Sequence, residues 1–124
     1  VDPFKMIQRI STIEPDEKQR AAASGIEFSP DGNHLFVTNA GINTVIIYDV
    51  DKETGVLTPL FHCKTSGDYP KAVAVMPDNK HFIVLSHETD EIFIYNMNYE
   101  DCYFLQDSRP IKIEQPNCIF IHKL

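Results

Sequence analysis

Asn39, Lys71 and His87 are the residues of this sequence whose types and positions best fit a chemical site. Lys71 opens the apolar run KAVAVM, whereas Asn39 and His87 come directly after the runs HLFVT and HFIVLS. Such runs predict strands, so all three residues lie where a strand begins or ends. An ammonium group can hold a carboxylate or phosphate, and an imidazole can transfer a proton near neutral pH. For His87 the alternative is a loop histidine without a chemical role.

The sequence has no pattern typical of a metal, nucleotide or serine-hydrolase site. Histidines and carboxylates lack the spacing of metal ligands, and neither a glycine-rich phosphate loop nor a Gly-x-Ser-x-Gly turn is present. Cys63, Cys102 and Cys118 are odd in number and lack Cys-x-x-Cys spacing, which indicates reduced core thiols in a cytoplasmic protein. We therefore expect no metal and no cofactor.

Charge and hydropathy narrow the class of partner. The chain carries 18 acidic and 11 basic residues, for a formal net charge of −7. This balance argues against nucleic acid and against an anionic membrane surface. No apolar run reaches the 18 residues of a membrane-spanning helix, so we expect no membrane segment.

An internal repeat indicates the architecture that positions these residues. Ser24 to Asp51 aligns without gaps to Lys71 to Asn98, a shift of 47 residues. The identical pairs are Pro30/Pro77, Asp31/Asp78, His34/His81, Val37/Val84, Ile47/Ile94 and Tyr48/Tyr95. A fixed period in this range is typical of repeat folds, in which neighbouring units bury each other's apolar faces.

Each repeat unit predicts a four-stranded antiparallel blade of a β-propeller. The runs GIEFS, HLFVT and TVIIYDV recur as KAVAVM, HFIVLS and EIFIYNM, and turn residues such as SPDGN separate them. Residues 57–64 supply a fourth strand, with a less regular equivalent in NYEDCYFLQDS. We therefore predict an all-β propeller fragment. Its parts are an outer strand in 1–12, blades in 22–66 and 68–113, and an inner strand in 115–124.

Antiparallel pairing brings the candidate residues to one end of the blades. The start of each inner strand lies beside the end of the second strand, which gathers Gly25, Asn39 and Ala40 in one blade. Lys71, Ser86 and His87 gather in the next, at the same mouth near the propeller axis. The turns at the two SPDG-like positions belong to the far face.

The quoted motifs, taken in order, resemble a known family. SPDGNHLFVTNAGINTVIIYDVDKETGVL, GDYPKAVAVMPDNKHFIV and QPNCIF look like the C-terminal part of the lactonase family of seven-bladed propellers. That family includes propeller-type 6-phosphogluconolactonases and carboxymuconate-cyclising enzymes. SPDG alone is weak evidence for this family because many propellers contain it. TGVL and the terminal Pro-x-Cys make the resemblance more specific. The similarity covers about Phe4 to the C-terminus.

The resemblance places function at the mouth, where this sequence departs from the pattern. The family has an acid before the I-x-x-SPDG strand and arginines after the Asn and Pro positions, whereas this chain has Gly25, Ala40 and Lys71. Lysine keeps the charge but loses the bidentate fork of arginine. The resemblance thus implies Lys71 and Asn39 as substrate-binding residues and His87 as the catalytic candidate, without a carboxylate partner.

Two function classes follow. The first is a 6-phosphogluconolactonase-like hydrolase of a small anionic lactone, incomplete or impaired in this chain. The alternative is a non-catalytic propeller that serves as a binding or assembly scaffold. Because 124 residues supply only two blades, exposed blade faces should recruit the remaining blades or further copies of the chain.

Overall fold

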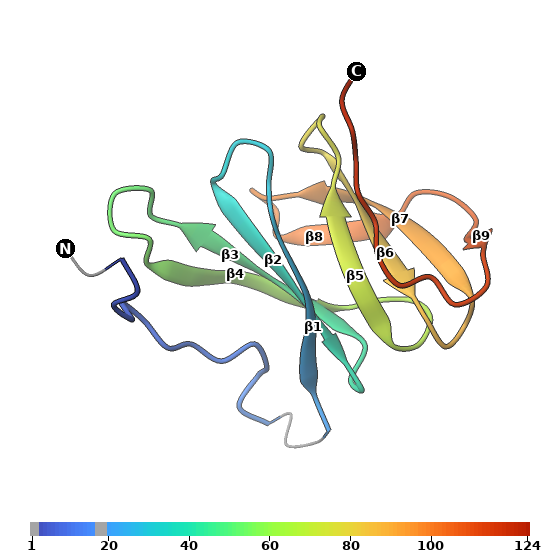
Figure 1. Cartoon of the computed structure of the whole chain (residues 1–124), viewed down its shortest axis with the longest axis horizontal. Coiled ribbons are helices and arrows are strands. Elements are labelled where there is room, and N and C mark those ends of the chain that lie inside the picture. The colour runs from blue at the N-terminus through green and yellow to red at the C-terminus, as the bar shows by residue number, and fades with distance from the viewer. Residues whose placement is uncertain (1–2, 17–19) are drawn as a thin grey trace.

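The computed structural model describes residues 3–16 and 20–124 as two antiparallel β-sheets packed face to face (Figure 1). The first blade has the order β1 (Ala22–Phe28), β2 (His34–Ala40), β3 (Thr44–Val50) and β4 (Leu57–Lys64). The second blade has the order β5 (Pro70–Val75), β6 (His81–Ser86), β7 (Glu91–Asn98) and β8 (Tyr103–Gln106), and β9 (Ile111–Lys112) also pairs with β7. The predicted all-β propeller fragment is confirmed.

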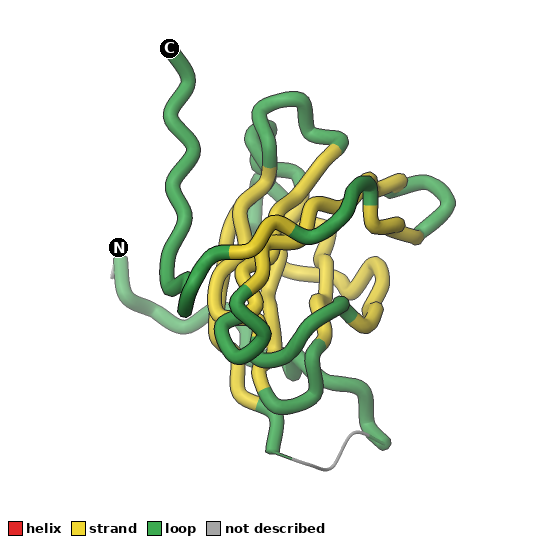
Figure 2. The backbone as a smooth tube through the Cα atoms, turned by 90° about the vertical axis from the view of Figure 1, so that its right-hand side faces the viewer, coloured by secondary structure: helices red, strands yellow, loops and turns green. Residues whose placement is uncertain are grey.

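The described part of the chain is strand and loop throughout (Figure 2). It has no helix long and apolar enough to cross a membrane. The turn residues explain the sharp chain reversals between strands. Gly32 and its repeat equivalent Asn79 both adopt positive φ, at 70° and 56°, which glycine and asparagine tolerate best.

The core lies between the two blades. The first blade contributes Phe36, Val45 and Ile47, which are fully buried. The second blade faces them with Val73, Val75, Phe82, Val84, Phe93, Tyr95 and Met97. Successive residues of a strand point to opposite faces of its sheet. Because the runs are apolar almost continuously, each blade has a second apolar face besides the one in the core.

The two terminal segments differ from their prediction as strands. Within residues 3–12 and 115–124 the structure has no strand, although residues 1–2 lie outside the described part. Instead, the Gln8 side chain donates from Nε2 to the Leu57 carbonyl at 2.9 Å and accepts from the Leu57 N–H at 2.7 Å. A strand needs a neighbouring strand for its backbone groups, and here one side-chain amide bonds the edge of β4 in place of a strand ladder.

The strand ends meet as the repeat predicts. The starts of β1 and β5 and the turns after β2 and β6 lie at the lower end of the blades in Figure 1, called the mouth end below. The turns that hold Asp31 and Asp78 lie at the opposite, far end. There, the Asn79 amide donates to an Asp31 carboxylate oxygen at 2.8 Å and joins the two turns.

Candidate functional site at the mouth end

Lys71 lies on a β-bulge at the start of β5. The ladder between β5 and β6 passes from the pair Pro70–Ser86 to the pair Ala72–Leu85, which leaves Lys71 unpaired. Bulges redirect a side chain and commonly adjoin functional sites. The Lys71 side chain is partly exposed and has no hydrogen bond or ion pair within the described residues. Its ammonium group is therefore available to an anion.

The first blade has the same bulge at Ser24, between Ala23 and Gly25. The Ser24 hydroxyl contacts the carbonyl of Pro70, the residue before Lys71. This contact joins the two bulges across the boundary between the blades. The repeat therefore places Ser24 and Lys71 at equivalent positions. Ser24 contacts the next blade, whereas Lys71 has no hydrogen bond or ion pair in residues 3–16 and 20–124.

His87 has a carboxylate partner, contrary to the expectation from sequence. Its Nδ1 lies 2.8 Å from Oε1 of Glu88, and the Tyr69 ring packs edge-on at 6.3 Å between ring centroids. The His87 backbone N–H also donates to the Tyr69 carbonyl at 3.0 Å. With Nδ1–H held by the carboxylate, Nε2 carries the lone pair of a general base. Sequence reasoning missed Glu88 because adjacent residues point the same way only in an irregular turn such as 87–90.

The loop that precedes Lys71 is fixed by Asn43. Tyr69 has a φ of 59°, which is rare for a bulky residue. Asn43 accepts the Tyr69 N–H at 3.0 Å and donates to an Asp68 carboxylate oxygen at 2.9 Å. The Asn43 carbonyl also accepts from the Thr65 N–H at 2.8 Å. The turn between β2 and β3 thus holds the approach to β5 in place.

Asn39 lies at the mouth end but is buried inside the protein, with no exposed surface. Its amide donates to the Thr12 carbonyl at 2.7 Å and to the Thr44 hydroxyl at 3.2 Å, and Oδ1 accepts from the Thr12 hydroxyl at 2.7 Å. Both N–H donors are therefore in use. The structure brings Asn39 close to the N-terminal segment, and its substrate-binding role stays a prediction.

Gly25 and Ala40 occupy positions with little space for larger side chains. A Cβ on Gly25 would lie 2.8 Å from the Thr38 hydroxyl and 3.0 Å from Cα of Ala72. Ala40 is 2% exposed and pairs with Ala22. An acid at the first position or an arginine at the second would therefore require the surrounding strands to move.

The sequence of this chain matches one family model over nearly its whole length. Residues 2–121 match the family described as Lactonase, 7-bladed beta-propeller. The chain belongs to this lactonase family. It is 22% identical over 122 residues to the 6-phosphogluconolactonase of Bacillus subtilis strain 168, covering 98% of this chain and 35% of that protein. It is 26% identical over 128 residues to muconate cycloisomerase 1 of Cutaneotrichosporon cutaneum, covering 91% of this chain and 32% of that protein.

A solved lactonase-like structure has the same arrangement of blades. The crystal structure of a candidate 6-phosphogluconolactonase from Bacteroides fragilis superposes with a TM-score of 0.78 at 26% identity, covering 90% of this chain and 31% of that one. The chain therefore spans about a third of the length of these relatives. Whether it corresponds to their C-terminal part stays a prediction.

An arginine at the mouth end of this lactonase-family chain was missed from sequence. Arg20 precedes β1, and its backbone carbonyl lies 2.0 Å from where a Cβ on Gly41 would be, beside Ala40. Its side chain is exposed. The sequence signal that could have identified Arg20 was its position, two residues before β1, which starts at the mouth end. The backbone of an arginine thus lies beside Gly41, next to the position where the family resemblance implies one.

The described residues contain no group of three or more His, Cys, Asp or Glu side chains that could hold a metal ion. The three cysteines are free, with Cys63 partly buried and Cys102 and Cys118 exposed. Burial raises the pKa of the Cys63 thiol, which keeps it protonated near neutral pH.

Proposed function

We propose that the mouth end binds a small anionic lactone of the kind that 6-phosphogluconolactonases hydrolyse. The observation that carries the proposal is the Lys71 ammonium group, which has no hydrogen bond or ion pair among the described residues and lies on a bulge at the mouth end, where the family resemblance implies a ligand. An unpaired lysine gains most from a phosphate or carboxylate, because charge-assisted hydrogen bonds are the strong ones. Arg20, whose backbone lies beside Gly41 at the same end and whose side chain is exposed, would be the second cation of this site.

His87 and Glu88 supply the proton-transfer pair of this site. Their 2.8 Å contact orients the imidazole and stabilises its protonated form after it accepts a proton. In lactone hydrolysis, His87 Nε2 would take a proton from a water molecule as the water oxygen bonds to the lactone carbonyl carbon. The bond from that carbon to the ring oxygen would then break, and the ring oxygen would take the proton from His87. The products are a hydroxyl and a carboxylic acid, which releases its proton to solvent and becomes a carboxylate.

The present chain by itself is proposed to bind this ligand without hydrolysing it. The family's acid position is Gly25, where Thr38 and Ala72 leave no room for a carboxylate side chain. Two blades also leave the mouth open to water, which weakens electrostatic stabilisation of the oxyanion. The closed Gly25 position favours the second candidate, a non-catalytic binding scaffold, over an active hydrolase in this chain alone.

Calorimetric titration with 6-phosphogluconate, the stable hydrolysis product, tests the binding site. Lys71→Ala should weaken binding by about tenfold, the loss of one charge-assisted contact of about 1.4 kcal/mol. Lys80→Ala removes a lysine at the far-end turn and should leave binding unchanged. Equal binding by the wild-type chain and Lys71→Ala would contradict the assignment of Lys71.

Hydrolysis is measured separately with 6-phosphogluconolactone, after subtraction of the spontaneous rate. We expect no turnover above that rate from the wild-type chain. Turnover that disappears in both Lys71→Ala and His87→Ala would instead show that these mouth residues are sufficient for catalysis, and would overturn the scaffold reading.

A further inference from the structure

Tyr69 has an uncommon backbone conformation at the mouth end. It directly precedes β5 and has a φ of 59°. Other non-glycine residues with positive φ in residues 3–16 and 20–124 include Asn43, Asn79 and Asp90, whose short polar side chains tolerate this region. A bulky aromatic residue does not, and the proline that follows Tyr69 restricts its backbone further. Backbone strain of this kind clusters at functional sites, so a tyrosine at this position calls for a functional reason.

Two hydrogen bonds of its backbone hold Tyr69 in this conformation. Its N–H donates to Oδ1 of Asn43 at 3.0 Å, and its carbonyl accepts from the His87 N–H at 3.0 Å. Asn43 belongs to the turn after β2 and His87 to the turn after β6, so both blades take part. The direction of the Tyr69 side chain is therefore fixed before a ligand binds, which lowers the entropic cost of binding.

The Tyr69 side chain has surface that no protein group covers. The residue is 41% exposed, and its ring meets the His87 ring at 62° between planes, with 6.3 Å between centroids. Such a tilted contact covers at most one face of the tyrosine ring. The hydroxyl has no hydrogen bond within the described residues. Contacts inside the protein therefore do not account for a tyrosine on this strained backbone.

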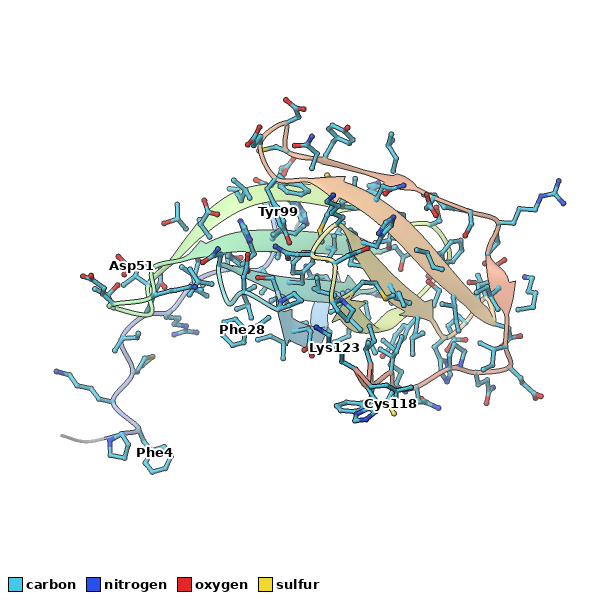
Figure 3. The ribbon with its side chains drawn as sticks, turned by 90° about the horizontal axis from the view of Figure 1, so that it is seen from above. Phe4, Phe28, Asp51, Tyr99, Cys118 and Lys123 are labelled. Atoms are coloured by element: carbon cyan, nitrogen blue, oxygen red, sulfur yellow. The ribbon has the colours of Figure 1, made fainter. Side chains whose placement is uncertain are left out.

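A second tyrosine–histidine pair in this chain has the geometry of a structural contact. Tyr99 belongs to the far end, which faces the reader in Figure 3. Its ring lies flat on His34, with 3.7 Å between centroids and 7° between planes, and its hydroxyl donates to Asn79 Oδ1 at 3.0 Å. Tyr69 has neither a stacked ring nor a bonded hydroxyl. Its geometry thus fits contact with an incoming molecule better than a contact between blades.

The neighbours of Tyr69 indicate the chemistry of that molecule. Lys71 follows two residues later, so their Cα atoms are at most about 7 Å apart, and the His87 ring lies beside the tyrosine ring. A phosphorylated sugar lactone has an anionic group, an electrophilic carbonyl and a ring face of C–H bonds. The ammonium, the imidazole and the aromatic ring offer one partner to each. Ligand sites commonly combine aromatic surface with a few polar groups in this way.

We propose that Tyr69 determines the specificity of this site for a cyclic ligand, by packing its ring on the C–H face of the lactone ring. The inference rests on the anion site proposed above, because Lys71 would hold the phosphate or carboxylate of the same ligand. The tilted contact between the two rings then brings the lactone beside His87. An open-chain acid has no ring face and binds through its anionic groups alone.

Calorimetric titration with two probes tests this specificity: glucose 6-phosphate, which has a sugar ring, and 6-phosphogluconate, which is open-chain. Tyr69→Asn removes the aromatic ring but keeps a residue that tolerates positive φ. It should weaken glucose 6-phosphate binding by about tenfold, the size of one aromatic contact, and change 6-phosphogluconate binding by less than about twofold. Tyr69→Phe keeps the ring and should bind both probes like the wild-type chain. The matched control is Tyr103→Asn, which removes a tyrosine that is 42% exposed at the far-end start of β8 and should change neither affinity.

The possible results separate this inference from the proposed function. Equal losses of both probes in Tyr69→Asn would show that the residue only shapes the loop, and unchanged glucose 6-phosphate binding would show that its ring is not used. Either result overturns the role of Tyr69, as does loss of binding in Tyr69→Phe or a wild-type chain that binds 6-phosphogluconate alone. The anion site still stands in these cases if Lys71→Ala weakens 6-phosphogluconate binding. A wild-type chain that binds neither probe would overturn the anion site and this inference together.

Discussion

Gly25 of the first blade and Ala72 of the second bring the two sheets into backbone contact at the mouth end. A Cβ on Gly25 would lie 3.0 Å from Cα of Ala72 and 2.8 Å from the Thr38 hydroxyl. Contacts under 3.0 Å force a neighbour to move, and here the nearest neighbours belong to two different strands. Close packing of the two blades therefore explains why position 25 has no side chain, independently of any chemical role of the mouth end.

Gly25→Ala should destabilise the fold. Overpacking of a close contact typically costs about 1–3 kcal/mol of the free energy of unfolding. Urea unfolding measures this loss, with Glu27→Ala on the exposed part of the same strand as the control. A Gly25→Ala variant as stable as the wild-type chain would show that the blades can separate without cost, and would reopen this position to an acid.

Tyr99 should stabilise the contact between the blades at the far end. Its ring stacks on His34 of the first blade, with 3.7 Å between ring centroids and 7° between planes, and its hydroxyl donates to Asn79 Oδ1 at 3.0 Å. Tyr99→Phe removes one hydrogen bond and should lower the unfolding free energy by about 1 kcal/mol. Tyr99→Ala also removes the ring and should lower it by about 3 kcal/mol. Equal effects in urea unfolding would contradict the stacking contribution.

His34 should make stability depend on pH in the weakly acidic range. Burial of its ring lowers its pKa, partly offset by the carboxylates of Asp49 and Asp31, and Nδ1 is buried without a partner. Tyr99, which stacks on the ring, stays neutral because burial raises the pKa of its hydroxyl. The unfolded chain binds a proton at His34 near its ordinary pKa of about 6.5, before the folded chain does. Stability should therefore fall as pH decreases through about 6.5.

Urea unfolding at pH 7.5, 6.5 and 5.5 checks the sign. His34→Gln should flatten the change between these values relative to the wild-type chain. Asp31 contributes in a different window: the hydrogen bond from Ser29 lowers its pKa, so its stabilisation is lost only as pH falls below about 4. A wild-type chain that gains stability between pH 7.5 and 5.5 would refute the role of His34.

The sequence predicted the parts of the fold that local chemistry determines. The bounds of β3, β4 and β6 agree with the runs read from sequence, because turn residues mark both ends of each run. The strands predicted in the terminal segments do not form, since strand structure depends on a neighbouring partner that periodicity alone does not reveal. At the mouth, topology located Lys71 and His87 correctly, whereas the burial of Asn39 and the contact with Glu88 depend on side-chain packing.

Asn39 is expected to act as the anchor of the N-terminal segment, and its replacement should loosen that segment. Its amide and the Thr12 main chain and hydroxyl form two hydrogen bonds of 2.7 Å, one in each direction. Asn39→Ala removes both and leaves the Thr12 carbonyl without its donor, which costs about 1–3 kcal/mol locally. Opening of a segment exposes its cleavage sites to protease in proportion to its open population.

Limited trypsin digestion reports that opening through cleavage after Arg9, which precedes the anchor in the chain. The Asn39→Ala variant should be cut there about 5- to 160-fold faster than the wild-type chain, in line with that cost. Asn96→Ala, which removes an exposed amide of the second blade far from Thr12, is the matched control and should leave the rate unchanged. If Asn39→Ala is cut no faster after Arg9, the amide does not hold the segment, and its free donors would again be candidates for ligand binding.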